Sequence, residues 1–186
     1  MDITVIREEA FTTHIFSIIS TMGDKHMSIS KKIAYSGVVM ALYVVVVFAT
    51  QGFSFGLYQI RIATALYALA FHFPFLVVPL ALANMLSNLL MGGLGVFDIV
   101  GGFLIGLITS GSIVLLKKAT DRAVLLVLPI ALAPALIVPI WLSIILKVPY
   151  FVLVLSLLVG QVISAYTLGL YIIKSKWIKK LLNQPQ

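Results

Sequence analysis

Residues 75–116 read FLVVPLALANMLSNLLMGGLGVFDIVGGFLIGLITSGSIVLL, and this stretch decides the class of the fold. It contains one charged side chain, Asp98, and two apolar runs separated by a turn with three glycines, residues 92–95. A helix that crosses the hydrocarbon core of a bilayer needs about 20 mainly apolar residues. The stretch therefore predicts two membrane-spanning helices, over residues 75–91 and 97–116.

The rest of the chain has the same character. Of its 186 residues 61% are hydrophobic and 10% are charged, with a mean hydropathy of +1.14, whereas about 25% of the residues in an average soluble domain are charged. Further apolar runs cover residues 33–50, 61–73, 123–146 and 150–173. We therefore expect an all-α integral membrane protein, with a single domain over residues 27–186 that is a bundle of six transmembrane helices. Three prolines within residues 123–146 predict a bent or broken helix there.

Residues 1–26 differ in composition from this domain. Phe11, Ile15 and Ile18 recur at helical spacing among polar residues, which is typical of an amphipathic helix on a membrane surface. The segment is too short and too polar to span, and it lacks the basic start and the small-residue cleavage site of a signal peptide. Two interpretations stay open, an amphipathic helix and a dispensable N-terminal extension.

The basic residues are concentrated at alternate ends of the expected spans. Six spans place the two termini, the turn at residues 72–75 and the loop at residues 117–122 on one side of the membrane. That side carries Lys25, Lys31, Lys32, Lys117, Lys118, Arg122, Lys174, Lys176, Lys179 and Lys180, whereas the other side carries Arg61 and Lys147. Lys and Arg are enriched in cytoplasmic loops. The basic side, with both termini, is therefore predicted to be cytoplasmic, and the net charge of +7 requires no nucleic acid partner.

Most of the polar candidates fall in the opposite, outer half of the membrane. They are Tyr58, Gln59 and Arg61 before or at the start of the second span, Asn84 and Asn88 in the third, Asp98 at the start of the fourth, and Trp141 and Tyr150 beside the last outer turn. A polar side chain in hydrocarbon costs free energy, so those that are present usually have a function. An outward-facing solute pocket explains this distribution better than a proton pathway, which needs ionisable groups through the full depth.

The amides and the carboxylate each have two interpretations. Asn84 and Asn88 are four residues apart and share a helix face with Ser87, where they either recognise a heterocycle edge with donors and acceptors or join neighbouring helices. Asp98 needs a partner, which is either Arg61 or a cationic or NH-rich solute. Arg61 has a further alternative, in which its side chain extends to the membrane interface.

The aromatic candidates are also open to two interpretations. Tyr58, Trp141 and Tyr150 suit stacking on a planar ligand, and they equally suit the belt of aromatic residues at membrane interfaces. Gln161 lies in the last span next to a row of small residues and is a candidate for lining a polar cavity.

Small residues at four-residue spacing let helices approach closely. In residues 97–116 they are Gly102, Gly106 and Ser110, where we expect packing within the bundle. In the first span they are Gly37 and Ala41, with Ala34 beside them. There, packing within the bundle and docking onto another membrane protein both stay open.

Motifs of catalysis are absent from the sequence. There is no phosphate-binding Gly-Lys-Ser/Thr loop, no His-Glu-x-x-His and no pair of carboxylates, and the chain has no cysteine. We expect neither an enzyme nor a metal or cofactor site, so any ATP hydrolysis would take place on a partner protein.

Three segments resemble the QueT family. Residues 58–66, YQIRIATAL, are similar to its QFRISEAL segment, and residues 88–102, NLLMGGLGVFDIVGG, to its N-L-x-G-G-x-G-x-x-D-x-x-x-G segment. Residues 31–43, KKIAYSGVVMALY, resemble its first helix. QueT proteins are substrate-binding S-components of energy-coupling factor (ECF) transporters, assigned to queuosine precursors.

The resemblance implies a six-helix importer subunit in a prokaryotic plasma membrane. It would bind a 7-deazaguanine such as preQ0, preQ1 or queuine from outside, through the positions that match the family, Gln59, Arg61, Asn88 and Asp98. It would dock through small residues of its first helix onto the membrane coupling protein EcfT, which two ECF ATPases drive.

One difference concerns the substrate, because the family's Ser-Glu is Ala63-Thr64 here. If that Glu contacts the ligand or balances its charge, the change implies a less cationic solute or a different one. Two other functions stay open, a membrane sensor or scaffold and a stand-alone carrier for a small heterocyclic solute.

Overall fold

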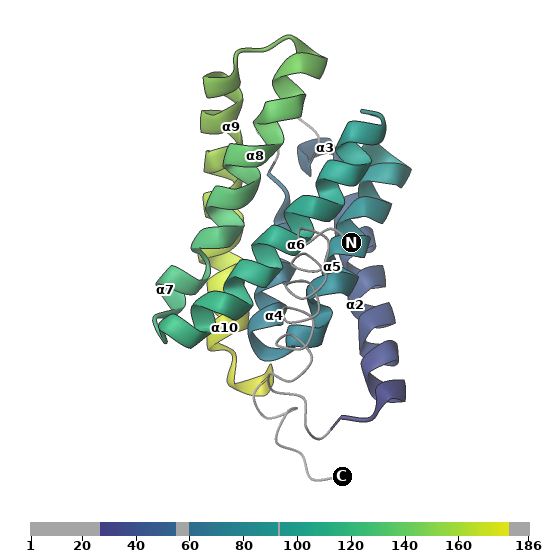
Figure 1. Ribbon diagram of the computed structural model, residues 1–186, viewed down its shortest axis with the longest axis vertical. Helices are drawn as coiled ribbons and strands as arrows, with labels where there is room; N and C mark the ends of the chain where they lie inside the picture. The colour runs from purple at the N-terminus through teal and green to yellow at the C-terminus, as the bar shows by residue number, and fades with distance from the viewer. Residues whose placement is uncertain (1–26, 55–59, 93, 179–186) are drawn as a thin grey trace, which may run out of the picture.

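The computed structural model describes residues 27–54, 60–92 and 94–178, and every regular element in them is a helix (Figure 1). The predictions for residues 1–26, Tyr58 and Gln59 lie outside these ranges. Five described helical stretches are long and apolar enough to cross a membrane: Ile29–Ala49, Pro74–Gly92, Val96–Ala119, Ala123–Leu146 and Tyr150–Ile178. They support the predicted class, a helical multi-pass membrane protein. The remaining expected span is the shorter apolar helix Ile62–His72.

The long stretches are built from the following elements. They are α2 (Ile29–Ala49); η2 (Pro74–Leu76), α5 (Val77–Ser87) and the π-helical turn η3 (Asn88–Gly92); α6 (Val96–Ala119); α7 (Ala123–Leu126) and α8 (Leu128–Leu146); and α9 (Tyr150–Ser164), the π-helical turn η4 (Ala165–Gly169) and α10 (Leu170–Lys174). A short helix, α3 (Gln51–Ser54), follows α2. Packing joins α5 to α6, α8 to α9, α2 to α5 and α6 to α8.

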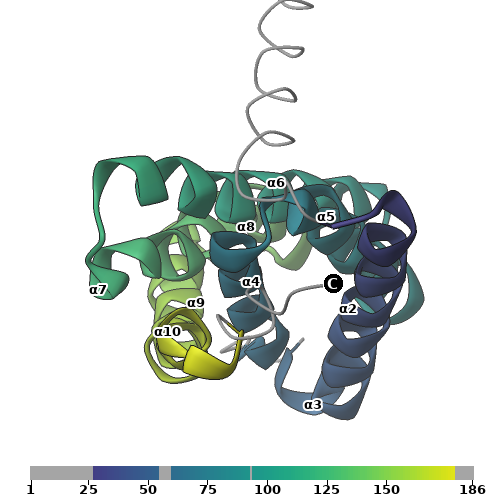
Figure 2. The ribbon, with the colours of Figure 1, turned by 90° about the horizontal axis from the view of Figure 1, so that it is seen from below.

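The short apolar helix is the central element of the bundle. It consists of the 3₁₀ helix η1 (Ile62–Ala68) and α4 (Leu69–His72), and η1 contacts α2, α5, α6, α8, α9, α10 and η4. Figure 2 shows α4 between α2 on one side and α9 with α10 on the other. Alanines at positions 63, 65 and 68 are buried, and their small side chains let the surrounding helices approach.

This central element covers only part of the membrane's thickness. A 3₁₀ helix rises about 2.0 Å per residue and an α-helix about 1.5 Å, so the two pieces span about 20 Å, against a hydrocarbon core of about 30 Å. At the C-terminal end of α4 the His72 ring forms a hydrogen bond with the Ile172 carbonyl, with 3.0 Å between Nε2 and O. Beside it, Lys117 Nζ donates a hydrogen bond to the Phe71 carbonyl at 2.8 Å. His72 therefore lies at the basic end of the bundle, and Arg61, which precedes η1, lies deep in the opposite half.

The proline-rich stretch confirms the expected break. The helix is interrupted at Val127, between α7 and α8, and Pro129 occupies the first turn of α8, where its missing N–H leaves no hydrogen bond unmade. Pro134 and Pro139 lie inside α8 without ending it. Both are buried.

The buried apolar side chains form two clusters. The larger includes Tyr43, Tyr67, Leu80, Ile113 and Ile130 and joins α2, η1, α5, α6 and α8. The smaller joins α8 to α9 and is made of Ala135, Leu142, Leu153 and Leu157. The smaller cluster borders the candidate site, because Leu157 lines that cavity.

Candidate functional site

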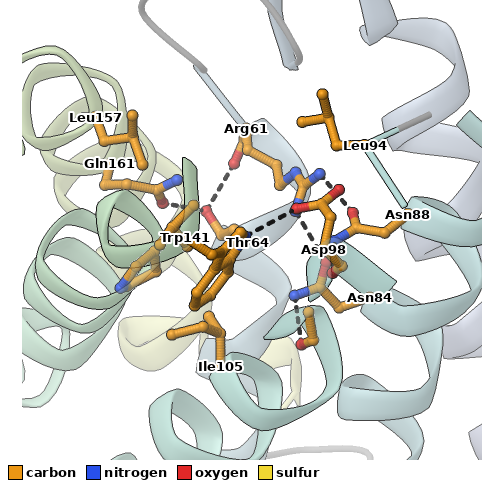
Figure 3. A pocket seen from close by; sticks show the side chains of 13 residues that line it. Arg61, Thr64, Asn84, Asn88, Leu94, Asp98, Ile105, Trp141, Leu157 and Gln161 are labelled. Carbon is orange, nitrogen blue, oxygen red and sulfur yellow. Dashed lines mark hydrogen bonds between the residues drawn. The ribbon is translucent and has the colours of Figure 1, made fainter. Parts of the chain in front are cut away.

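Polar side chains from four helical stretches and the start of η1 surround a small cavity in the half of the bundle away from its basic end (Figure 3). Its lining residues are Arg61, Thr64, Asn84, Asn88, Leu94, Asp98, Gly102, Ile105, Pro134, Val138, Trp141, Leu157 and Gln161. The free space is about 20 Å³, which is enough for about one water molecule. The polar groups therefore contact one another in this conformation.

Arg61 is held by two amides of α5 and η3. Its Nη1 donates to Asn84 Oδ1 at 2.9 Å and its Nη2 donates to Asn88 Oδ1 at 2.7 Å. The planar guanidinium carries donors in a fixed fork, and the spacing of the two asparagines, one helical turn apart, matches that fork. The predicted alternative of a side chain that extends to the interface is wrong, since Arg61 points into the bundle.

The same two amides join α5 to α6. Asn84 Nδ2 donates to the Gly102 carbonyl and Asn88 Nδ2 donates to the Asp98 carbonyl, both at 2.8 Å. Gly102 permits this approach, because a Cβ there would lie 2.6 Å from Asn88 Nδ2. The amides thus perform the structural role that the sequence allowed, and they also position Arg61 at the cavity.

Asp98 presents its carboxylate to the cavity from the first turn of α6. Its Oδ1 accepts a long hydrogen bond of 3.4 Å from Trp141 Nε1. Its Oδ2 is buried and accepts no hydrogen bond from the described residues. A buried carboxylate oxygen without a donor is costly, so this atom is the place in the cavity where a ligand N–H group would gain most.

Trp141 reaches the cavity because α6 has no side chain opposite its ring. A Cβ at Gly101 would lie 2.6 Å from Trp141 Cζ2. The indole is thereby placed against the same space as Asp98 (Figure 3). Trp141 therefore lines the cavity, and its stacking on a planar ligand stays a prediction.

Thr64 and Gln161 close the opposite wall. Thr64 Oγ1 lies 2.8 Å from Gln161 Oε1 and 2.6 Å from the Arg61 carbonyl, and its single proton serves one of these acceptors at a time. Ser164 Oγ adds a bond of 3.1 Å to the Arg61 carbonyl. These contacts fix the start of η1 against α9, so the Arg61 backbone is held as firmly as its side chain.

A family model described as QueT transporter matches residues 33–178. The chain belongs to the QueT transporter family. No curated protein and no solved structure matches it. Membership confirms the resemblance and implies a role in membrane transport rather than in catalysis.

In this QueT chain the structure brings together five of the eight predicted site residues, Arg61, Asn84, Asn88, Asp98 and Trp141. Tyr150 lies apart from the cavity lining, and its hydroxyl donates to the Leu136 carbonyl at 2.8 Å. Tyr58 and Gln59 fall outside the described residues. Gln161, a candidate from its row of small residues, does line the cavity.

Several residues that line the cavity could not be predicted from the sequence. Leu94, Ile105, Pro134, Val138 and Leu157 are ordinary apolar residues of a membrane protein, and nothing in their type or spacing sets them apart. The sequence did set Thr64 apart, because this residue replaces the Glu of the QueT segment. Its position in the cavity connects that replacement to the site itself.

Proposed function

We propose that this QueT protein is the S-component of an ECF transporter and captures a queuosine precursor or a related 7-deazaguanine base from outside the cell. The observation that carries the proposal is the buried Asp98 carboxylate, whose Oδ2 has no donor among the described residues and borders the cavity. A deazaguanine offers ring N–H and amino donors side by side, and a carboxylate can accept two of them. The charge asymmetry between the two ends of the bundle supports an outward-facing cavity, because the basic end is expected to be cytoplasmic.

Capture requires the cavity to widen, because a space of about 20 Å³ does not accommodate a bicyclic base. The 3.4 Å hydrogen bond from Trp141 to Asp98 is long and therefore weak. We propose that the base takes the place of the indole N–H at Asp98 and stacks against the displaced ring. Arg61, Asn84 and Asn88 then act as the fixed wall, since each already holds two or more partners.

The direct test is calorimetric titration of the purified full chain with preQ0, preQ1, queuine and guanine. We expect saturable binding of at least one 7-deazaguanine and weaker or no binding of guanine. Binding of none of the four would contradict the substrate class. Uptake without any ATPase partner, measured in vesicles containing this chain alone, would instead favour the stand-alone carrier.

Charge in the cavity suggests which base is preferred. Arg61 and Asp98 are the only ionisable residues among those that line it, so the described lining has no net charge. A neutral base fits such a site better than one with a protonated amine. We expect preQ0, which carries a nitrile, to bind more tightly than preQ1, which carries an aminomethyl group.

Thr64→Glu tests this dependence on charge. A carboxylate at position 64 would give the lining a net negative charge, so the ratio of preQ1 affinity to preQ0 affinity should rise about tenfold or more, the equivalent of about 1.4 kcal/mol. Thr64→Gln is the matched control, because it adds the same bulk without charge and should leave the ratio unchanged. An equal change in both variants would show that bulk, and not charge, sets the preference.

Coupling to the energising partners is proposed to use α2. Of its 21 residues only Tyr43 and Val47 are buried, and Ala34, Gly37 and Ala41 are all exposed. A Cβ at Gly37 would have no heavy atom of the described residues within 4 Å. These small residues therefore do not pack α2 within the described bundle, and a partner helix of EcfT could approach there closely.

Gly37→Leu and Ala41→Leu should block assembly with EcfT and the two ATPases. A large side chain on this face holds the partner helix away, while solute binding by the isolated chain should stay unchanged. Co-purification of the complex measures assembly, and Val38→Ala, on the same exposed helix, is the control that should assemble normally. If both leucine variants assemble as well as the wild type, the face is not the docking site.

A further inference from the structure

A second hollow lies on the surface of the bundle, between α6 and α8 and apart from the solute cavity. This groove has a volume of about 520 Å³. Its walls are almost wholly apolar and include Leu115 and Leu116 of α6 with Leu128, Leu132 and Leu136 of α8. Leu115 is 55% exposed and Leu136 is 47% exposed. In a membrane protein such a surface faces lipid.

The groove is about as long as the hydrocarbon part of one leaflet is thick. It runs from Leu128, near the start of α8, to Ile137, which is about 14 Å along the helix axis. Half of the hydrocarbon core is about 15 Å thick. The groove therefore starts close to the basic end of the bundle and ends near the middle of the membrane, which is the reach of one acyl chain.

Positively charged side chains follow the end of the groove that is nearer to the membrane surface. Lys118 lies one helical turn beyond Leu115 on the same face of α6, and Arg122 precedes α7, where the chain turns toward α8. Both side chains are exposed. The exposed acid Asp121 lies in the same turn, so the exposed side chains there carry two positive charges against one negative.

We propose that this groove binds one acyl chain of an anionic phospholipid from the leaflet on the basic side, with the lipid phosphate between Lys118 and Arg122. The apolar walls hold the chain, and the two cations select a negative headgroup, as basic residues at the cytoplasmic ends of membrane helices do. A helix of a partner protein is a poorer fit, because it would need a groove through both leaflets. The site is independent of the solute cavity.

Native mass spectrometry of the full chain in detergent tests the headgroup contact. The probes are phosphatidylglycerol and phosphatidylcholine with identical acyl chains. We expect phosphatidylglycerol to bind at least about tenfold more tightly, and Lys118→Gln and Arg122→Gln each to weaken it about fivefold. Lys31→Gln removes an exposed charge from α2, which lies on the opposite side of the bundle from α7 (Figure 2), and should change nothing.

Ala133→Trp tests the chain contact. Ala133 lines the groove, so a tryptophan there fills it and should abolish tight binding of phosphatidylglycerol, whereas Val159→Trp, on the lipid-facing side of α9, should not. Equal binding of the two lipids, an effect of Lys31→Gln as large as that of Lys118→Gln, or unaltered binding by Ala133→Trp would each overturn the proposal. Loss of assembly with EcfT in Ala133→Trp, with lipid binding intact, would assign the groove to a protein partner and overturn it too.

Discussion

Asp98→Asn should weaken binding of the preferred 7-deazaguanine at least about tenfold. The amide keeps the volume of the side chain and can still face Trp141, whose Nε1 lies 3.4 Å from Asp98 Oδ1. It offers only one acceptor oxygen where the carboxylate offers two, so one donor of a ligand in this buried cavity meets an N–H group instead of an oxygen. An unmade bond of this kind costs about 1–3 kcal/mol, and 1.4 kcal/mol is a factor of ten.

Calorimetric titration of each purified variant measures this effect. Tyr150→Phe is the control, because its hydroxyl donates to the Leu136 carbonyl and does not line the cavity. That variant should bind as the wild type does. If Asp98→Asn binds with unaltered affinity while the wild type still binds a deazaguanine, the substrate class stands and the role of Asp98 is refuted.

Gly106→Ala should lower the unfolding temperature, whereas Gly111→Ala should not. Both glycines lie within α6, so both substitutions gain the same helix propensity. A Cβ at Gly106 would lie 2.5 Å from Ala81 Cα, a backbone atom of α5, and a Cβ at Gly111 would have no described heavy atom within 4 Å. Forcing α5 and α6 apart costs about 1–3 kcal/mol, and each 1 kcal/mol shifts the midpoint by about 2–4 °C for a chain of this size.

Thermal unfolding followed by tryptophan fluorescence separates the two variants. The comparison isolates the contact with Ala81 from the intrinsic effect of replacing glycine by alanine. Equal midpoints for Gly106→Ala and Gly111→Ala would mean that α5 and α6 move apart without cost. Our interpretation of Gly106 as a packing residue would then fail.

Much of the fold follows from the sequence because a bilayer imposes simple rules. Runs of about 20 apolar residues located the five long helical stretches to within a few residues, and prolines located the break before α8. The segment at residues 61–73 was less predictable. Its 3₁₀ geometry comes from the helices that surround it, since seven residues of 3₁₀ helix are unusual and the alanines of η1 have no local preference for it.

The polar half of the site could be predicted, and the apolar half could not. Asn84, Asn88 and Asp98 stood out because polar residues are rare in these helices. Trp141 was located but its role stayed open, since the space that Gly101 leaves for it depends on how α6 meets α8. Leu157 and Ile105 could not be predicted to line the cavity, because an apolar residue that lines a cavity has the same type and spacing as one that faces lipid.

The central element also bears on how tightly the protein seals the membrane. From Arg61 to His72 the chain advances about 20 Å, and fully buried side chains such as Tyr67, Leu80, Ile113 and Ile130 fill the surroundings. Water and ions entering from the side of Arg61 would meet packed apolar side chains, and the described residues leave no pore between them. If a solute binds beside Arg61 as proposed, rotation of side chains alone gives it no way across, and its release would require that packed helices separate or that the bundle reorient as a body.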